Sequence, residues 1–156
     1  LAINPKSHEL YQNIDSDSEI AVIDPATMAV SRTIPTPEVK HNHPLQYDAA
    51  YDQIVIAGGG VMSAYAPGGK KLGEIPVGRF DQCDLDQTQH VLACAGDGGV
   101  TRFQLVRNAA PKLLDKVAID PGVHTVAIDP VTHAVFAVWA DRDGKGDFVQ
   151  KFTPAP

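Results

Sequence analysis

The stretch VHTVAIDPVTHAVFAVWAD at residues 123–141 has three related copies in the same chain. LAINPKSHELYQNID begins at residue 1, HPLQYDAAYDQIVIAGG at residue 43 and FDQCDLDQTQHVLACAGD at residue 80. In each copy a short apolar run ends at an Asp or Asn, a polar turn follows, and a second apolar run begins. These marker residues, spaced 44, 38 and 43 positions apart, are Asn4, Asp48, Asp86 and Asp129. A recurrence of this length indicates a repeat architecture.

Each repeat contains the pattern of several short strands. Period-2 alternation predicts second strands at 9–14, 53–57, 91–95 and 134–140, third strands at 19–23, 61–65, 100–105 and 148–152, and fourth strands at 30–34, 72–77 and 113–119. First strands are expected at 1–3, 45–47, 83–85 and 126–128. Four antiparallel strands in about 40 residues form the blade of a β-propeller. We therefore predict an all-β β-propeller segment of four four-stranded antiparallel blades, the last one incomplete, that belongs to a larger ring. The blades are expected at about 1–40, 41–78, 79–121 and 122–156.

Three segments also carry a family resemblance. AIDPVTHAVF, AVIDPATMAVSRTIPT and GGKKLGEIPVG resemble the YVTN or YncE-like β-propeller repeats of bacterial surface and periplasmic proteins. The resemblance covers essentially the whole chain, and it implies the C-terminal half of a ring of about seven blades. It also implies a periplasmic or extracellular location. Because such propellers serve many functions, it implies little about chemistry.

The composition excludes several classes of protein. The chain has 156 residues, 44% of them hydrophobic, which is enough for a packed core. Its apolar runs stop at about six residues, far below the ~20 that cross a bilayer, so we expect no membrane span. The formal net charge of −6 disfavours contact with nucleic-acid phosphates. The chain begins inside an apolar strand pattern without a signal peptide, as expected after processing or truncation.

The strand count predicts a partner. The fourth repeat ends with FVQKFTPAP, after its third strand, and the N-terminus offers no additional strand for the empty place. An open arc would leave two apolar blade faces in water. We therefore expect a homo-oligomer in which two arcs close one ring, or a separate N-terminal half that completes it. Contacts are expected near Leu10 and Ile14 of the first repeat and near Val135 and Trp139 of the last.

The two cysteines lie on the first and second strands of the third repeat. Folding that hairpin about its turn near Thr88 brings Cys83 and Cys94 opposite each other or nearly so. A cross-strand disulfide is therefore geometrically possible. Two small buried thiols are the alternative.

Three polar residues share one place in the repeats. His43, Asp81 and His124 each lie five residues before their marker, and His41 lies two residues from His43 on the same side of an extended strand. Equivalent positions of innermost strands converge on the central channel. Two imidazoles and a carboxylate there could hold a divalent metal or act as an acid/base pair. The competing interpretation is a wet channel mouth lined by polar side chains.

A second candidate metal site is the segment DRDGKGD at 141–147. Asp141, Asp143 and Asp147 are spaced like calcium ligands, but Lys145 and Phe152 stand where further acidic ligands are needed. An acidic hairpin turn therefore fits better. Three other histidines recur in the turn after the first strand, which favours a role in turn structure over catalysis; they are His8, His90 and His133.

The sequence contains no catalytic motif of a known type. The favoured function is an extracytoplasmic binding or scaffold propeller without a cofactor. The first alternative is a propeller lactonase or hydrolase with a divalent metal at the channel mouth, held by His43, Asp81 and His124. The second is a structural subunit of a larger complex.

Overall fold

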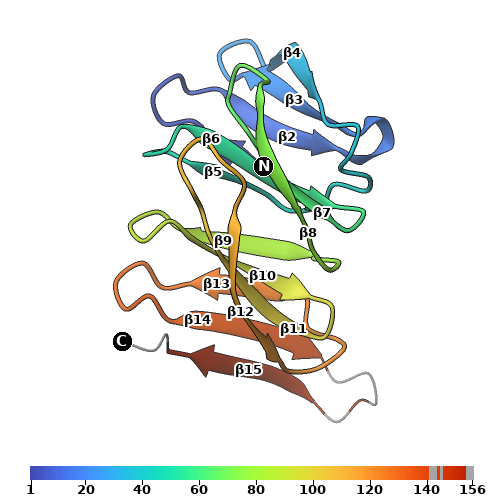
Figure 1. The fold of residues 1–156 in the computed structure, drawn as a ribbon, viewed down its shortest axis with the longest axis vertical. Coiled ribbons are helices and arrows are strands. Elements are labelled where there is room, and N and C mark those ends of the chain that lie inside the picture. Colours follow the sequence, from blue (N-terminus) through green and yellow to red (C-terminus); the bar gives the residue numbers. More distant parts are fainter. Residues whose placement is uncertain (141–143, 145, 154–156) are drawn as a thin grey trace.

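The computed structural model describes residues 1–140, 144 and 146–153, and these form four antiparallel sheets (Figure 1). Sheet 1 contains β1 (Ala2–Ile3), β2 (Leu10–Ile14), β3 (Glu19–Asp24) and β4 (Ala29–Pro35). Sheet 2 contains β5 (Leu45–Asp48), β6 (Gln53–Gly58), β7 (Val61–Tyr65) and β8 (Lys71–Pro76). Sheet 3 contains β9 (Gln82–Asp86), β10 (Val91–Gly96), β11 (Gly99–Gln104) and β12 (Lys112–Ala118). Sheet 4 contains β13 (Thr125–Ile128), β14 (Val135–Ala140) and β15 (Asp147–Phe152).

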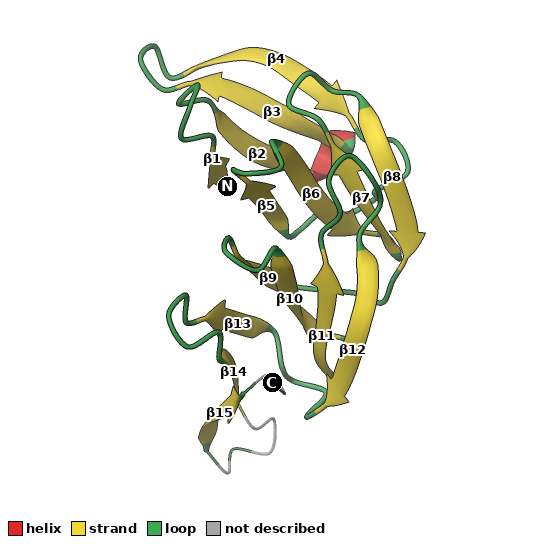
Figure 2. Cartoon of the chain, turned by 60° about the vertical axis from the view of Figure 1, so that its left-hand side comes forward, coloured by secondary structure: helices red, strands yellow, loops and turns green. Residues whose placement is uncertain are grey.

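The sheets are stacked like the blades of a propeller. Within each sheet the strands follow one another in chain order. Figure 2 shows β1, β5, β9 and β13 along one edge of the stack, with β4, β8 and β12 along the opposite edge. This is the blade arrangement, in which the first strands line the channel side. The chain is therefore a four-bladed β-propeller segment, and the predicted all-β fold is confirmed. Each sheet lies inside one of the predicted blade ranges.

Helical structure in the described residues is limited to the short 3₁₀ turn η1 (Asp15–Asp17). No helix within these residues has the length and apolar character required to cross a membrane. The ends of the strands agree with the sequence expectation to within about two residues, which is the usual scatter of strand boundaries.

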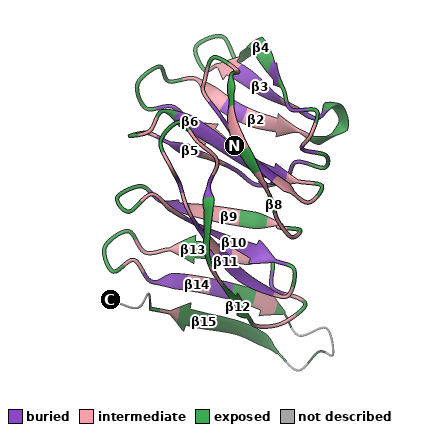
Figure 3. Ribbon diagram, viewed as in Figure 1, coloured by how far each residue is buried: buried purple, intermediate pink, exposed green. Residues whose placement is uncertain are grey.

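Apolar side chains between neighbouring sheets form the core. Between the first two blades, Tyr11 and Val22 pack with Tyr47 and Ile54, all of them buried. The second strands of blades 2 and 3, β6 and β10, are buried on both faces, because a blade lies on each side of them, whereas β15 is mainly exposed (Figure 3). Removing a large apolar side chain from water contributes about 1.5–3 kcal/mol. Packing between blades is therefore a main source of stability.

The marker aspartates build the turns between first and second strands. Asp48 Oδ1 accepts the backbone N–H groups of Ala50 and Tyr51 at 3.0 and 2.9 Å. Four residues after each marker the backbone turns left-handed, with φ of +63° at His8, +54° at Asp52, +55° at His90 and +60° at His133. A carboxylate or amide that accepts backbone N–H groups two and three residues ahead is the hydrogen bonding of an Asx turn. His8, His90 and His133 thus occupy the left-handed position of these turns, as expected for a role in turn structure.

The faces of the last blade are reversed relative to our expectation. Val135 and Trp139 belong to the core shared with the third blade, so they do not form the outer face. The outer face instead carries their neighbours Phe136 and Val138, and Val138 is paired with the exposed Val149 of β15. Successive strand residues point to opposite sides, so an error of one residue exchanges the two faces.

Candidate functional site

A groove opens on one face of the propeller between the first three blades. It encloses about 650 Å³ and is lined by Asp15, His41, His43, Gly58–Gly60 and Arg79–Asp81. The lining comes from η1, from the loops that enter β5 and β9, and from the turn between β6 and β7. The predicted residues His41, His43 and Asp81 therefore share one concave surface. Asp15 and Arg79 belong to it as well and were not predicted, although Arg79 stands two residues before Asp81 as His41 stands two residues before His43.

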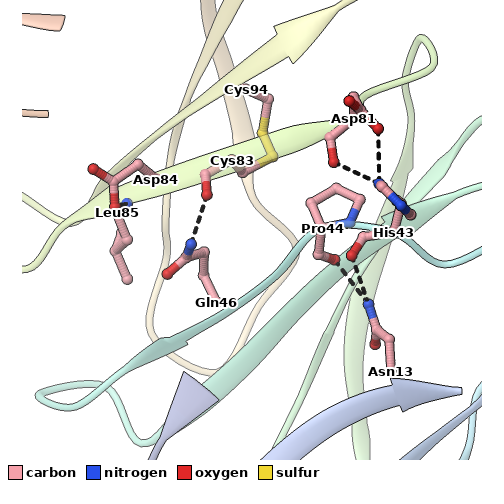
Figure 4. Close-up of a disulfide and its surroundings, with 9 residues drawn as sticks. All are labelled: Asn13, His43, Pro44, Gln46, Asp81, Cys83, Asp84, Leu85 and Cys94. Carbon is pink, nitrogen blue, oxygen red and sulfur yellow. Dashed lines mark hydrogen bonds and ion pairs between the residues drawn. A yellow bond between two sulfur atoms is a disulfide. The ribbon is translucent and has the colours of Figure 1, made fainter. Parts of the chain in front are cut away.

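Contacts from two blades hold the loop that carries the two histidines. Asn13 Nδ2 donates to the carbonyl oxygens of His43 and Pro44, both at 3.2 Å (Figure 4). Asn42 Nδ2 donates to the Glu19 carbonyl at 3.2 Å, and the His43 N–H donates to the Ala57 carbonyl at 3.1 Å. The loop is thus fixed to blades 1 and 2, and the imidazole of His43 projects from a defined backbone.

Glycine at the end of the second strand lets this loop approach. A Cβ on Gly58 would lie 2.4 Å from the Lys40 carbonyl oxygen and 2.6 Å from that of His41. The same position in the third blade is Gly96, where a Cβ would lie 2.4 Å from the Arg79 carbonyl oxygen. Backbone passes over backbone at both places, so only a residue without a side chain fits.

His43 and Asp81 form a contact across the second and third blades. His43 Nδ1 lies 2.8 Å from Asp81 Oδ1 and 2.8 Å from the Asp81 carbonyl oxygen (Figure 4). Both oxygens are acceptors, so Nδ1 carries the proton and Nε2 of the neutral ring remains an acceptor. The side chains are 65% and 45% exposed, so water screens the pair. His41 makes a longer contact of 3.3 Å from Nδ1 to Asp15 Oδ1.

The structure does not bring the third predicted ligand to this pair. His124 is exposed, and its Nδ1 lies 2.9 Å from Thr125 Oγ1 of its own blade. Across the described residues, no group of three or more His, Cys, Asp or Glu side chains is placed to hold a metal ion. Of the residues with calcium-like spacing, Asp147 begins the exposed strand β15, while Asp141 and Asp143 lie outside the described residues.

The two cysteines are joined. Cys83 of β9 and Cys94 of β10 are directly opposite in the strand register, and a disulfide connects them (Figure 4). Cys94 is fully buried. The bond ties the channel-side strand of the third blade to its second strand, close to Asp81.

A second set of polar contacts lies at the other end of the first strands. His90 Nδ1 lies 2.7 Å from Asp48 Oδ2, and His133 Nδ1 lies 2.5 Å from Asp86 Oδ2. Each histidine thus reaches the marker aspartate of the preceding blade, a role beyond the turn structure that the sequence predicted. Burial raises the pKa of Asp86, but hydrogen bonds from Thr88, Gln89 and His133 outweigh it and hold this pKa below its usual value.

Comparisons with known proteins support the fold and no particular activity. No family model matches the chain, and no curated protein matches its sequence. In structure it is similar to Kuenenia stuttgartiensis hydrazine synthase, with a TM-score of 0.83 and 12% sequence identity. The match covers 97% of this chain and 44% of that chain, so this chain spans less than half the length of its structural neighbour. At such low identity the likeness shows a shared propeller-type fold. The YVTN or YncE-like resemblance stays a prediction.

Proposed function

We propose that this chain is a binding segment of a β-propeller that holds its ligand in the face groove. The observation that carries this proposal is the groove itself, in which loops of three successive blades surround His43. The carboxylates of Asp15 and Asp81 each contact a histidine. Among the described residues Arg79 has no ion-pair partner, and His43 Nε2 remains an acceptor. A ligand that carries an anionic group next to a hydrogen-bond donor, such as a hydroxycarboxylate, complements these two groups.

We further propose that the chain acts outside the cytoplasm. The Cys83–Cys94 disulfide supports this location, because structural disulfides persist in oxidising compartments and are rare in the cytosol. The resemblance to repeats of exported propellers agrees with it. Mass spectrometry of protein purified without reductant from an exporting host should find these two cysteines linked, and two freely alkylated thiols would contradict the proposal.

A titration monitored by ¹H–¹⁵N NMR tests the groove, with tartrate as the probe. We expect amide shifts confined to residues 15–18, 41–43, 58–60 and 79–81, because these segments line or flank the groove. Arg79→Gln and His43→Ala should each weaken tartrate binding about tenfold, the loss expected for one well-formed hydrogen bond. His124→Ala, an exposed histidine outside the groove, is the control and should bind like the natural chain. Shifts absent from these segments would refute the proposal.

A metal-dependent hydrolase is the second candidate, and the contact between His43 and Asp81 favours it. Metal-binding histidines commonly donate their other ring N–H to a carboxylate or carbonyl, as His43 Nδ1 does. His43 Nε2 would then be one ligand of the ion. The other ligands would have to come from groups that are not gathered around His43 within the described residues. Calorimetry with zinc separates the two candidates. One equivalent of bound zinc, lost in both His43→Ala and Asp81→Asn, would favour the enzyme over the binding segment.

We also propose that the chain completes its ring with a partner, either a second copy or further blades. The outer faces of the first and last blades support this role as a structural subunit. Ile3 is 57% exposed, while Val138 and Val149 are 37% and 69% exposed. Apolar faces of this kind mark surfaces of protein association.

A further inference from the structure

The contacts between marker aspartates and histidines lie outside the groove and follow one rule. In the two junctions between blades 2, 3 and 4, the histidine four residues after a marker binds the marker aspartate of the blade before it. We call each such contact a junction pair. The aspartates are almost fully buried, with side-chain exposures of 0% for Asp48 and 2% for Asp86. Each pair therefore lies in the interface between two blades that pack face to face.

The first junction lacks both members of the pair at once. The marker of blade 1 is Asn4, and the residue four positions after the marker of blade 2 is Asp52. Each instead bonds within its own blade: Asn4 Nδ2 donates to the Tyr11 hydroxyl at 3.3 Å, and the Tyr47 hydroxyl donates to Asp52 at 2.5 Å. At the three junctions between the four blades, the following blade carries the histidine only where the preceding blade carries the carboxylate.

Two halves of a junction pair remain unmatched, one at each end of the arc. His8 occupies the histidine position of blade 1; it is exposed, and its ring makes no hydrogen bond within the described residues. Asp129 is the marker of blade 4. It accepts the Val131 N–H at 2.9 Å and the Thr132 hydroxyl at 2.6 Å, both from its own turn. A carboxylate has about four acceptor positions, and these two bonds use two of them, so Asp129 can accept a further donor.

Apolar side chains are also exposed on the two end faces of the arc. Ile3 precedes its marker by one residue and is 57% exposed, whereas Tyr47 and Leu85 at the same position are only 3% and 8% exposed. At the other end, Val138 is 37% exposed, whereas its equivalents Ala57 and Ala95 are at most 2% exposed. Within the described residues, both faces therefore carry the positions of an internal junction and are uncovered.

We propose that the first blade of a second copy packs on the last blade of this chain, with His8 of one copy bound to Asp129 of the other. The inference rests on the proposed completion of the ring by a partner and names that partner as the same chain. The interface would continue the packing already present between blades 2, 3 and 4. Two such contacts, related by a two-fold axis along the channel, would join two arcs of four blades into one ring, within the 4–8 blades typical of propellers.

Light scattering and sedimentation of the natural chain and two variants test the proposal. The natural chain should have twice the chain mass of 16.7 kDa. Asp129→Asn keeps an oxygen for the turn but removes the charge, and His8→Gly keeps the left-handed backbone but removes the imidazole. Each variant removes both pairs of the ring and should raise the dimer dissociation constant about 100-fold, tenfold for each pair. His124→Ala, a histidine of the last blade that belongs to no junction pair, should leave it unchanged.

Mixing the two variants separates a specific contact from general damage. A ring with one His8→Gly chain and one Asp129→Asn chain retains one intact pair, so the mixture should associate about tenfold more tightly than either variant alone. Unchanged circular dichroism and melting of dilute samples should show that both variants fold. A monomeric natural chain at all concentrations, or a dimer that neither substitution weakens, would overturn the second copy as partner. Such a result leaves the tartrate titration of the groove unaffected, so the two proposals fail separately.

Discussion

Gly58 determines where the groove histidines lie, because the loop at 40–44 crosses directly over its backbone. We expect Gly58→Ala to lower the free energy of unfolding by about 1–3 kcal/mol, since the new Cβ overlaps the carbonyl oxygens of Lys40 and His41. The loop should move, and the NMR signals of His43 should shift with it. Urea denaturation measures the first effect. Gly68→Ala is the matched control, because a Cβ there meets nothing within 4 Å, and equal destabilisation by the two substitutions would contradict this explanation.

Asp86 should make stability depend on pH in the acid range. Its pKa is lowered in the folded state, so its contribution is complete above the unfolded value of about 3.9 and is lost as the pH falls through the folded value. Asp86→Asn should therefore lower the free energy of unfolding by about 1–3 kcal/mol at pH 7, and the difference from the natural chain should shrink in acid. Asp24→Asn is the control, because Asp24 accepts the Ala26 N–H in a turn without a histidine. A difference that stays constant down to pH 2 would contradict the assignment.

At the scale of elements, the disulfide joins two strands that hydrogen bonds already pair. Cys83 and Cys94 are 11 residues apart, and closing so short a loop in the unfolded chain stabilises the fold by roughly 2–3 kcal/mol. Reduction with dithiothreitol should therefore lower the denaturation midpoint of the natural chain. The double substitution Cys83→Ser and Cys94→Ala should be less stable and should not respond to the reductant. A natural chain with the same midpoint in both redox states would show that the bond contributes nothing.

The strands themselves could be predicted from sequence because each carries its own local signal. Period-2 alternation locates β6 and β10, and the marker aspartates locate the turns before them. The orientation of a strand toward its neighbours has no such signal. In β14 the residues on both faces are apolar, so alternation does not distinguish the two faces. Only the packing of blade 4 on blade 3 determines that Val135 and Ala137 face blade 3. The expectation for Val135 and Trp139 was wrong for this reason.

At the scale of the whole molecule, repeat alignment predicts part of the site and misses the rest. It places His43 and Asp81 at equivalent positions, and packing of adjacent blades brings them into contact. Arg79 lies two residues before Asp81, at the aligned position of His41, but the different residue type hid this equivalence. Asp15 comes from a different turn, so only the stacked structure places it in the groove. The sequence shows that His90 and His133 recur at one position, four residues after a marker aspartate. Their bond to the preceding blade could not be read from one repeat, because its acceptor lies about 45 residues earlier in the chain.

The junction pairs also have a consequence for how similar units find their correct neighbours. Repeats with related sequences can exchange places during folding, a characteristic failure of such proteins. Here two of the possible misplacements would bring a blade against the wrong group. Blade 2 stacked behind blade 3 would bring Asp52 toward Asp86, two carboxylates in a poorly hydrated space, and blade 4 behind blade 1 would offer His133 an amide in place of a carboxylate. Two residues per unit thereby disfavour these two misplacements, although they do not distinguish blade 3 from blade 4, since both carry the histidine. Rearranging these repeats in an engineered protein therefore requires that each histidine follow a blade with a marker aspartate.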